Sequence, residues 1–165
     1  MKKIIVSILL FLPLGLAAQE VKIAVVQTQA VFNIMPEVSA MESEMATIQQ
    51  QYQSQFKVMQ DEYTRKYSEL SAQGDTLNEN IRMLRLQEIQ DIQQRLENFA
   101  PMAQEQIKKK QDELLAPIES KIQKAIKEVG EENGYTYILN PAACLYTGNA
   151  AIDATEKVKA KLGLK

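Results

Sequence analysis

The side chains that carry most enzymatic chemistry are nearly missing from this 165-residue chain. Histidine, the commonest general base and metal ligand, does not occur. Cys144 is the only cysteine, so the chain offers it no partner for a disulfide or a thiolate metal site. The sequence also contains no glycine-rich phosphate-binding loop. It therefore predicts a protein that is not an enzyme and that uses no cofactor and no metal.

The remaining charged clusters are interpreted as surface features. The acidic pairs at 61–62 and 131–132 are sequence neighbours, and neighbours in a helix point to different sides, which disfavours paired carboxylate chemistry. The lysine run at 108–110 is followed at once by two acidic residues, which indicates a solvated helix face rather than an anion site. Cys144 lies in Ala-Ala-Cys-Leu-Tyr and is interpreted as a small apolar residue rather than a redox thiol.

Residues 1–18 have the three-part pattern of a secretory signal peptide. Two lysines precede an apolar run at 4–12, and small residues follow up to Ala18. The run is too short to span a bilayer, so we predict export, cleavage after Ala18 and a soluble mature chain; the alternative is an uncleaved amphipathic start. Without Lys2 and Lys3 the chain has 17 basic and 21 acidic residues, a net charge of −4. That balance gives it no electrostatic reason to bind nucleic acid or an anionic membrane.

A long helix is predicted to begin at Pro36, whose missing N–H costs nothing in a first helical turn. From there apolar residues recur about every 3.6 positions as far as Leu70, with steps of three and four as in a coiled coil. A polar turn at 73–76 interrupts the stripe. Gly74 should stop the first helix, and Asp75 or Thr76 should cap the next one.

A second apolar stripe runs from Leu77 to Val129, so the two helices should pair as an antiparallel hairpin. Its two prolines, at 101 and 117, should kink or break the second helix. Gly130 and Gly134 should end the helical region.

Short strands are predicted on both sides of this hairpin. Residues 21–28 are rich in β-branched side chains, and 135–139 and 144–147 have similar character between turn residues. Asp153 and Glu156 have capping-box spacing and predict a closing helix.

These elements predict an α+β fold that is mostly α, in which the hairpin protrudes from a small β body. The expected organisation is a first strand and short helix at 19–35, the hairpin at 36–132, and two strands with a closing helix at 133–165. Three short strands make a poor core for one chain, so other copies should complete the body and hide the strand edges. The residues predicted to form this shared body are Ile23, Val25, Tyr137, Leu139 and Leu145.

The hairpin has more apolar and soft surface than one narrow seam requires. Methionine suits surfaces that must accept many shapes, so part of this surface is a candidate for binding unfolded polypeptides. Packing within the seam is the competing interpretation, especially for Met59, Tyr63, Ile92 and Leu96. The candidate binding residues are Tyr52, Phe56, Met59, Tyr63, Tyr67, Met83, Leu86, Phe99 and Met102.

The order and character of these segments resemble the Skp/OmpH family of periplasmic chaperones. Residues 22–26 and 30–32 look like the family's first strand and short helix, and the long middle breaks at a glycine-containing tip. Residues 137–140, through 143–146 to 152–155, look like its second and third strands and closing helix. The resemblance covers essentially the whole chain after the predicted signal peptide.

The resemblance implies a homotrimer with a shared β body and three helical arms around a cavity. It implies a protein that holds unfolded outer-membrane proteins in the periplasm without ATP. The family's best-known members have basic arms, whereas residues 37–132 contain 12 basic and 18 acidic residues, a net charge of −6. No lipopolysaccharide or membrane site is therefore carried over. The alternative function is a structural coiled coil of the cell envelope that binds no unfolded polypeptides.

Overall fold

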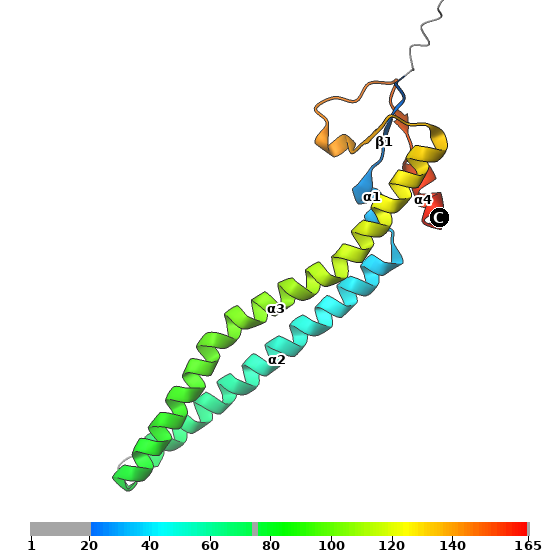
Figure 1. Cartoon of the computed structure of the whole chain (residues 1–165). Helices are drawn as coiled ribbons and strands as arrows, with labels where there is room; N and C mark the ends of the chain where they lie inside the picture. Colours follow the sequence, from blue (N-terminus) through cyan, green and yellow to red (C-terminus); the bar gives the residue numbers. More distant parts are fainter. Residues whose placement is uncertain (1–20, 74–75, 165) are drawn as a thin grey trace, which may run out of the picture.

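The computed structural model describes residues 21–73 and 76–164. The predicted signal peptide and the predicted tip residues Gly74 and Asp75 lie outside these ranges. In chain order the elements are β1 (Ile23–Val25), α1 (Thr28–Asn33), α2 (Pro36–Gln73), α3 (Glu79–Asn133), β2 (Tyr137–Leu139), a 3-10 turn (Pro141–Ala143), β3 (Ile152–Asp153) and α4 (Thr155–Lys161). Figure 1 shows α2 and α3 as a long arm that projects from a small body. The predicted α+β, mostly helical fold with an inserted hairpin is confirmed.

The body is built on a three-stranded parallel sheet in the order β2-β1-β3. Ala24 of β1 is in register with Ile138 of β2 on one side and with Ile152 of β3 on the other. The first strand predicted from the sequence is therefore the central one, and it is shorter than the predicted stretch of 21–28.

The strand predicted at 144–147 is wrong. That stretch is not a strand, and its Leu145 and Tyr146 are exposed. The physical reason is that β2 and β3 run parallel, and parallel strands need a connection of about a dozen residues. Residues 140–151 form that connection, so the third strand comes only at Ile152–Asp153.

The core of the body combines the inner face of the sheet with α1, α4 and the last turns of α3. Thr155, at the start of α4, is buried, and its hydroxyl accepts a hydrogen bond from the backbone N–H of Gln27 at 3.0 Å. This contact ties the two ends of the described chain together. The buried core residues are Ala24, Val26, Val31, Met35, Val38, Ile118, Ile122, Ala125, Val129, Ala154 and Val158.

The helix ends differ in detail from those predicted. α2 begins at Pro36 as expected, but the cap of α3 is Asn78, whose side chain accepts the N–H of Asn80 at 2.9 Å; Thr76 is not the cap. α3 is not broken at either proline and continues through both, although its axis changes direction along its length (Figure 1).

Glycine ends α3 only at Gly134, which has φ of +63°, while Gly130 lies inside the helix. A Cβ at Gly130 would come within 3.3 Å of Ile138, so the small residue allows β2 to approach α3 closely. At α4 the N-cap is Ala154 rather than Asp153. Asp153 lies one residue before this N-cap, and its side chain still accepts a hydrogen bond from the backbone N–H of Thr155 at 2.9 Å, the first residue of α4.

The left-handed backbone at Gly134 leads to a stability prediction. Gly134→Ala should lower the free energy of unfolding by about 1 kcal/mol, because an alanine there must adopt a conformation that its Cβ disfavours. Gly134→Asn is the matched control and should cost less, because asparagine tolerates this region better than alanine does. Urea unfolding followed by circular dichroism measures both. An alanine variant as stable as the parent would contradict the prediction.

Candidate binding surfaces of the arm and the body

The seam between α2 and α3 is only partly closed within one chain. Ile92 is 1% exposed, and Ile89 and Ala103 are also buried, so α3 contributes the well-packed positions. On α2 only Val38, near the body, is buried. The remaining stripe residues of α2 up to Leu70 are half-buried or exposed. The arm therefore keeps apolar surface that its own pairing does not cover.

Aromatic side chains occupy the middle and distal parts of the arm. Phe99 of α3 lies 5.9 Å from Tyr52 in an edge-on arrangement and 6.2 Å from Phe56, measured between ring centroids. Farther along α2, Tyr63 and Tyr67 are stacked at 6.1 Å. Such contacts stabilise pairs of rings by about 1 kcal/mol. The seam interpretation is therefore supported for Tyr52 and Phe99.

The structure divides the nine candidate binding residues of the arm into two groups. Half-buried in the single chain are Tyr52, Met59, Tyr63, Leu86 and Phe99. Exposed are Phe56, Tyr67, Met83 and Met102, with Met83 at 58%. Val58, Ile81 and Leu84 are exposed as well and were not among the candidates. Leu84 lies within the second predicted stripe, yet it is 62% exposed and therefore does not pack in the seam.

Several of these residues gather near the tip of the arm. A hollow of 650 Å³ at the start of α3 is lined by apolar and amide side chains together with one carboxylate. Its lining residues are Asn80, Met83, Leu84, Leu86, Gln87, Gln90 and Asp91. Residues of one helix make this surface, so it is open to solvent.

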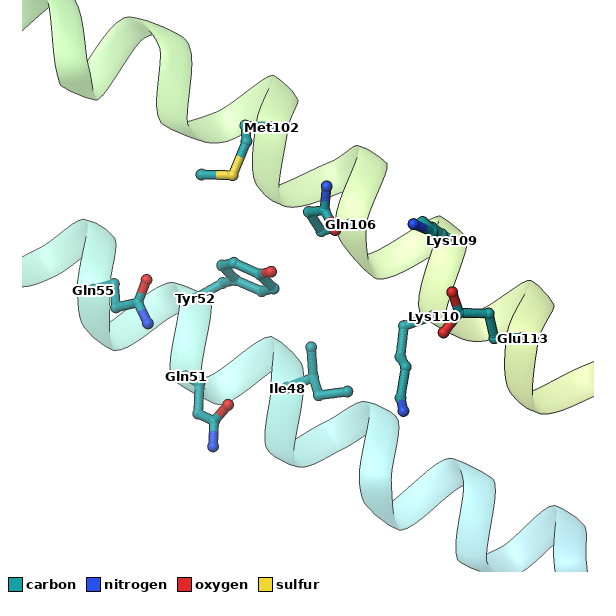
Figure 2. Close-up of a pocket in the computed structure, with 9 residues that line it drawn as sticks. All are labelled: Ile48, Gln51, Tyr52, Gln55, Met102, Gln106, Lys109, Lys110 and Glu113. Carbon is teal, nitrogen blue, oxygen red and sulfur yellow. The ribbon is translucent and has the colours of Figure 1, made fainter.

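A second opening, which we call the arm crevice, lies between α2 and α3 where α3 follows Pro101. It has a volume of 480 Å³ and is lined by Ile48, Gln51, Tyr52, Gln55, Met102, Gln106, Lys109, Lys110 and Glu113. Figure 2 shows Ile48 and Tyr52 rising from α2 toward Met102 and Gln106 of α3. The crevice combines an apolar wall with neutral amides and, at its end nearer the body, charged groups.

Three ion pairs join the helices along the arm. Lys66 pairs with Glu88 at 2.7 Å and Lys110 with Glu44 at 2.9 Å, and Lys121 pairs with Glu37 near the body. Lys110 is therefore not simply part of a solvated helix face. The Lys110–Glu44 and Lys121–Glu37 pairs are separated by seven residues on α2 but by eleven on α3. Helix α3 therefore has about one more turn than α2 between these two pairs. Pro117 lies in that extra stretch, beside a 320 Å³ hollow.

In each of these pairs the pKa of one member is shifted. The hydrogen bond from Lys121 holds the pKa of Glu37 below its usual value, and the hydrogen bond from Lys66 does the same for the pKa of Glu88. Across the Lys110–Glu44 pair, the hydrogen bond to Glu44 raises the pKa of Lys110. Each pair is partly exposed, so each contributes little to stability.

The sign of the Glu37 shift predicts acid weakening of the arm base. Because the pKa of Glu37 is lower in the folded chain, the unfolded chain takes up the proton first as pH falls. The contribution of the Glu37–Lys121 pair to the free energy of unfolding is therefore fully present above the ordinary pKa of 4.5. It is lost as pH falls through the folded pKa. Lys121→Met should make unfolding less acid-dependent in this window, by less than about 1 kcal/mol because both partners are over a third exposed. Urea unfolding at a series of pH values from neutral to acid measures the slope, and an identical slope would contradict the assignment.

The outer face of the sheet is a second uncovered apolar surface. Register places Ile23 beside Tyr137 and Val25 beside Leu139, on the face opposite the core residue Ala24. Ile23 is 39% exposed and Leu139 41%, and Tyr137 is more exposed still. Four of the five residues predicted for a shared body thus lie on one face. Leu145 is not in a strand and is fully exposed in the connection after β2.

A hollow of 310 Å³ lies against this outer face and includes Cys144. Its wall contains Ile23, Val25, Leu139 and Tyr146. Cys144 is half-buried rather than buried, and its thiol contacts the carbonyl oxygen of Asn140 at 3.4 Å.

Among the described residues, no group of three or more His, Cys, Asp or Glu side chains is placed to hold a metal ion. Within the same residues, no helix combines the length and apolarity needed to cross a bilayer.

Fold and surfaces together define a class of protein: an arm-and-body protein in which a helical hairpin is inserted into a parallel sheet. The model of the family described as outer membrane protein (OmpH-like) matches residues 22–162, so the chain belongs to the OmpH-like family. A crystal structure of a proposed outer membrane chaperone (OmpH-like) from Caulobacter crescentus CB15 is similar, with a TM-score of 0.75 and 15% sequence identity. The similarity covers 86% of this chain and 83% of that one. Comparison with curated proteins gave no match.

Proposed function

We propose that this chain is a periplasmic holding chaperone that binds unfolded outer-membrane proteins and prevents their aggregation without ATP. The observation that carries the proposal is the apolar surface that the arm leaves uncovered along its length, from Phe56 to Met83 and Met102. Membership of the OmpH-like family and the fold shared with a protein described as an outer membrane chaperone support it. The segment at 1–18 supports export.

The mechanism needs no chemical step. An unfolded barrel protein exposes alternating apolar strands, which aggregate in water. Scattered apolar contacts on the arm are individually weak, and several arms around one body would raise their effective concentration, so avidity replaces any single strong site. Weak contacts also allow release without fuel. The glutamine-rich and charged faces between them keep the holder itself in solution.

The proposed assembly is a homo-oligomer, and the family resemblance suggests a trimer. Ile23, Tyr137 and Leu139 form an apolar face on a sheet of only three short strands, and each of them is more than a third exposed within the part of the chain that the structure describes. Strand edges and apolar faces of this kind are usually covered by another copy. Several arms from one base would then surround a common space in which a polypeptide is held.

The alternative of an envelope scaffold expects the arm's apolar residues to lie within seams. Met83 and Met102 are exposed instead, on different parts of α3, and this weighs toward a binding role. Nothing in the arm favours a scaffold specifically.

The direct test dilutes a urea-unfolded outer-membrane protein into buffer that contains the mature protein at several-fold molar excess. Light scattering should fall strongly relative to dilution into buffer alone, because arm contacts compete with self-association. An equal mass of serum albumin is the control for nonspecific crowding. Scattering that matches the albumin control would remove the chaperone proposal.

A further inference from the structure

The arm crevice differs from the other apolar surfaces of the arm because both helices build it. Ile48 and Tyr52 of α2 face Met102 and Gln106 of α3 across the same space (Figure 2). Its 480 Å³ lies within the range of ordinary ligand sites. An apolar side chain that entered here would contact two helices at once, whereas on the tip hollow it would contact only one.

Two lysines line the end of the crevice nearer the body, and they differ in whether they are in an ion pair. The ammonium group of Lys110 is paired with Glu44, at 2.9 Å, and the charge of Glu113, which also lines the crevice, acts on the same ammonium group. Lys109 also lines the crevice, and within residues 21–73 and 76–164 it has no ion-pair partner. Elsewhere the arm is acidic, with a net charge of −6 over residues 37–132. The crevice therefore presents an ammonium group at one end of an apolar wall.

Amide side chains supply the third element of recognition. Gln51, Gln55 and Gln106 line the crevice, and each amide can both donate and accept hydrogen bonds. The backbone of an extended polypeptide presents donors and acceptors in alternation, which free amides can satisfy without regard to sequence. The aliphatic chain of a fatty acid offers these exposed amides no hydrogen bonds in place of those they make with water.

From these three features we propose that the crevice binds an extended segment of an unfolded polypeptide in which an apolar residue and an acidic residue lie on the same face. Met102 and Lys109 are seven residues apart, about 10 Å along the helix axis. An extended chain rises about 3.3 Å per residue with side chains alternating, so the acidic residue stands two or four positions from the apolar one. The flexible Lys109 side chain covers the difference. This inference rests on the proposed chaperone function and adds a sequence preference to it.

The test uses two fluorescein-labelled peptides that differ in charge. Both carry one leucine in a Ser/Thr-rich extended decamer; one has Asp two and four positions later, and the other has Lys there. Fluorescence anisotropy with the mature full-length protein should show the Asp peptide binding about threefold more tightly, the effect of one partly exposed ion pair. Lys109→Glu should reverse the preference to about threefold in favour of the Lys peptide.

Two further variants separate the crevice from general surface charge. Lys108→Glu is the matched control, because Lys108 does not line the crevice, and it should leave the preference for the Asp peptide in place. Met102→Gln should weaken both peptides equally and leave their ratio unchanged. Circular dichroism of each variant checks that the arm remains helical.

Equal affinity of the two peptides for the parent protein, or no binding of either, overturns the inference. A preference that Lys108→Glu changes as much as Lys109→Glu overturns it as well, because the charge effect would then be diffuse. Displacement of the peptides by decanoate, with no Asp preference, would assign the crevice to an anionic amphiphile instead. The light-scattering test of the proposed function is independent of these peptide measurements. If the protein still suppresses aggregation, the chaperone function stands and only the sequence preference of the crevice is rejected. If it does not suppress aggregation, the chaperone function itself is rejected.

Discussion

Replacing Ile23 and Leu139 together by glutamate is expected to convert the protein from an oligomer, proposed to be a trimer, into a monomer. Both side chains lie on the outer face of the sheet and are 39% and 41% exposed in the single chain. Charge at these positions therefore costs the isolated body little. Within an interface the same carboxylates would be buried without partners, at a cost of several kcal/mol. Multi-angle light scattering of the mature protein measures the change in mass.

Ala160→Glu is the matched control, since Ala160 is exposed on α4, away from this face. It should leave the mass unchanged. The double variant should also lose most of its suppression of aggregation, because a single arm lacks the avidity of several. A parent protein that is monomeric at micromolar concentration would contradict the proposed assembly. An oligomer that survives both glutamates would place its interface elsewhere.

Replacing the four exposed candidates of the arm by serine should abolish most binding of unfolded outer-membrane proteins. The set is Phe56, Tyr67, Met83 and Met102. Covering half of such a side chain contributes about 1 kcal/mol, so losing all four should lower affinity about a thousandfold. Phe56 and Tyr67 also contact Phe99 and Tyr63, so the free energy of unfolding should fall by about 2 kcal/mol as well. Aggregation suppression and urea unfolding, measured in parallel, separate the two effects.

The matched control replaces four exposed glutamines by serine, with the same number of changes spread over the same helices. Suitable positions are Gln53, Gln60, Gln94 and Gln104. Their loss should leave suppression close to that of the parent. Unchanged suppression in the apolar set would favour the scaffold alternative, in which these residues bind no unfolded polypeptide.

The helical arm was largely predictable because it depends on local periodicity. The stripe that begins at Val38 requires a helix at its 3.6-residue spacing, and Pro36 marks where that helix starts. Continuity through Pro101 and Pro117 was not predictable, since a proline ends or merely bends a helix according to what packs beside it. The contact of α3 with both α2 and the body keeps it whole.

The body was harder to predict because its strands have only two or three residues. β-propensity favoured 144–147 over 152–153, where an aspartate is disfavoured in a strand, and the parallel direction of the sheet overrides that preference. Composition likewise identified the pool of apolar residues on the arm but not which were exposed. Phe56 belongs to the regular stripe of α2, yet it is 37% exposed, and Met102 lines the open arm crevice.

The central place of β1 imposes an order on biogenesis. A chain that emerges from the ribosome N-terminus first delivers β1 at once, but the partners of β1 are residues 137–139 and 152–153. The helices between them can zip together meanwhile, because their contacts close outward from a short turn. The hairpin of α2 and α3 can therefore be complete before the sheet of the body forms. The sheet of the body can therefore form only after residues 152–153 have been synthesised.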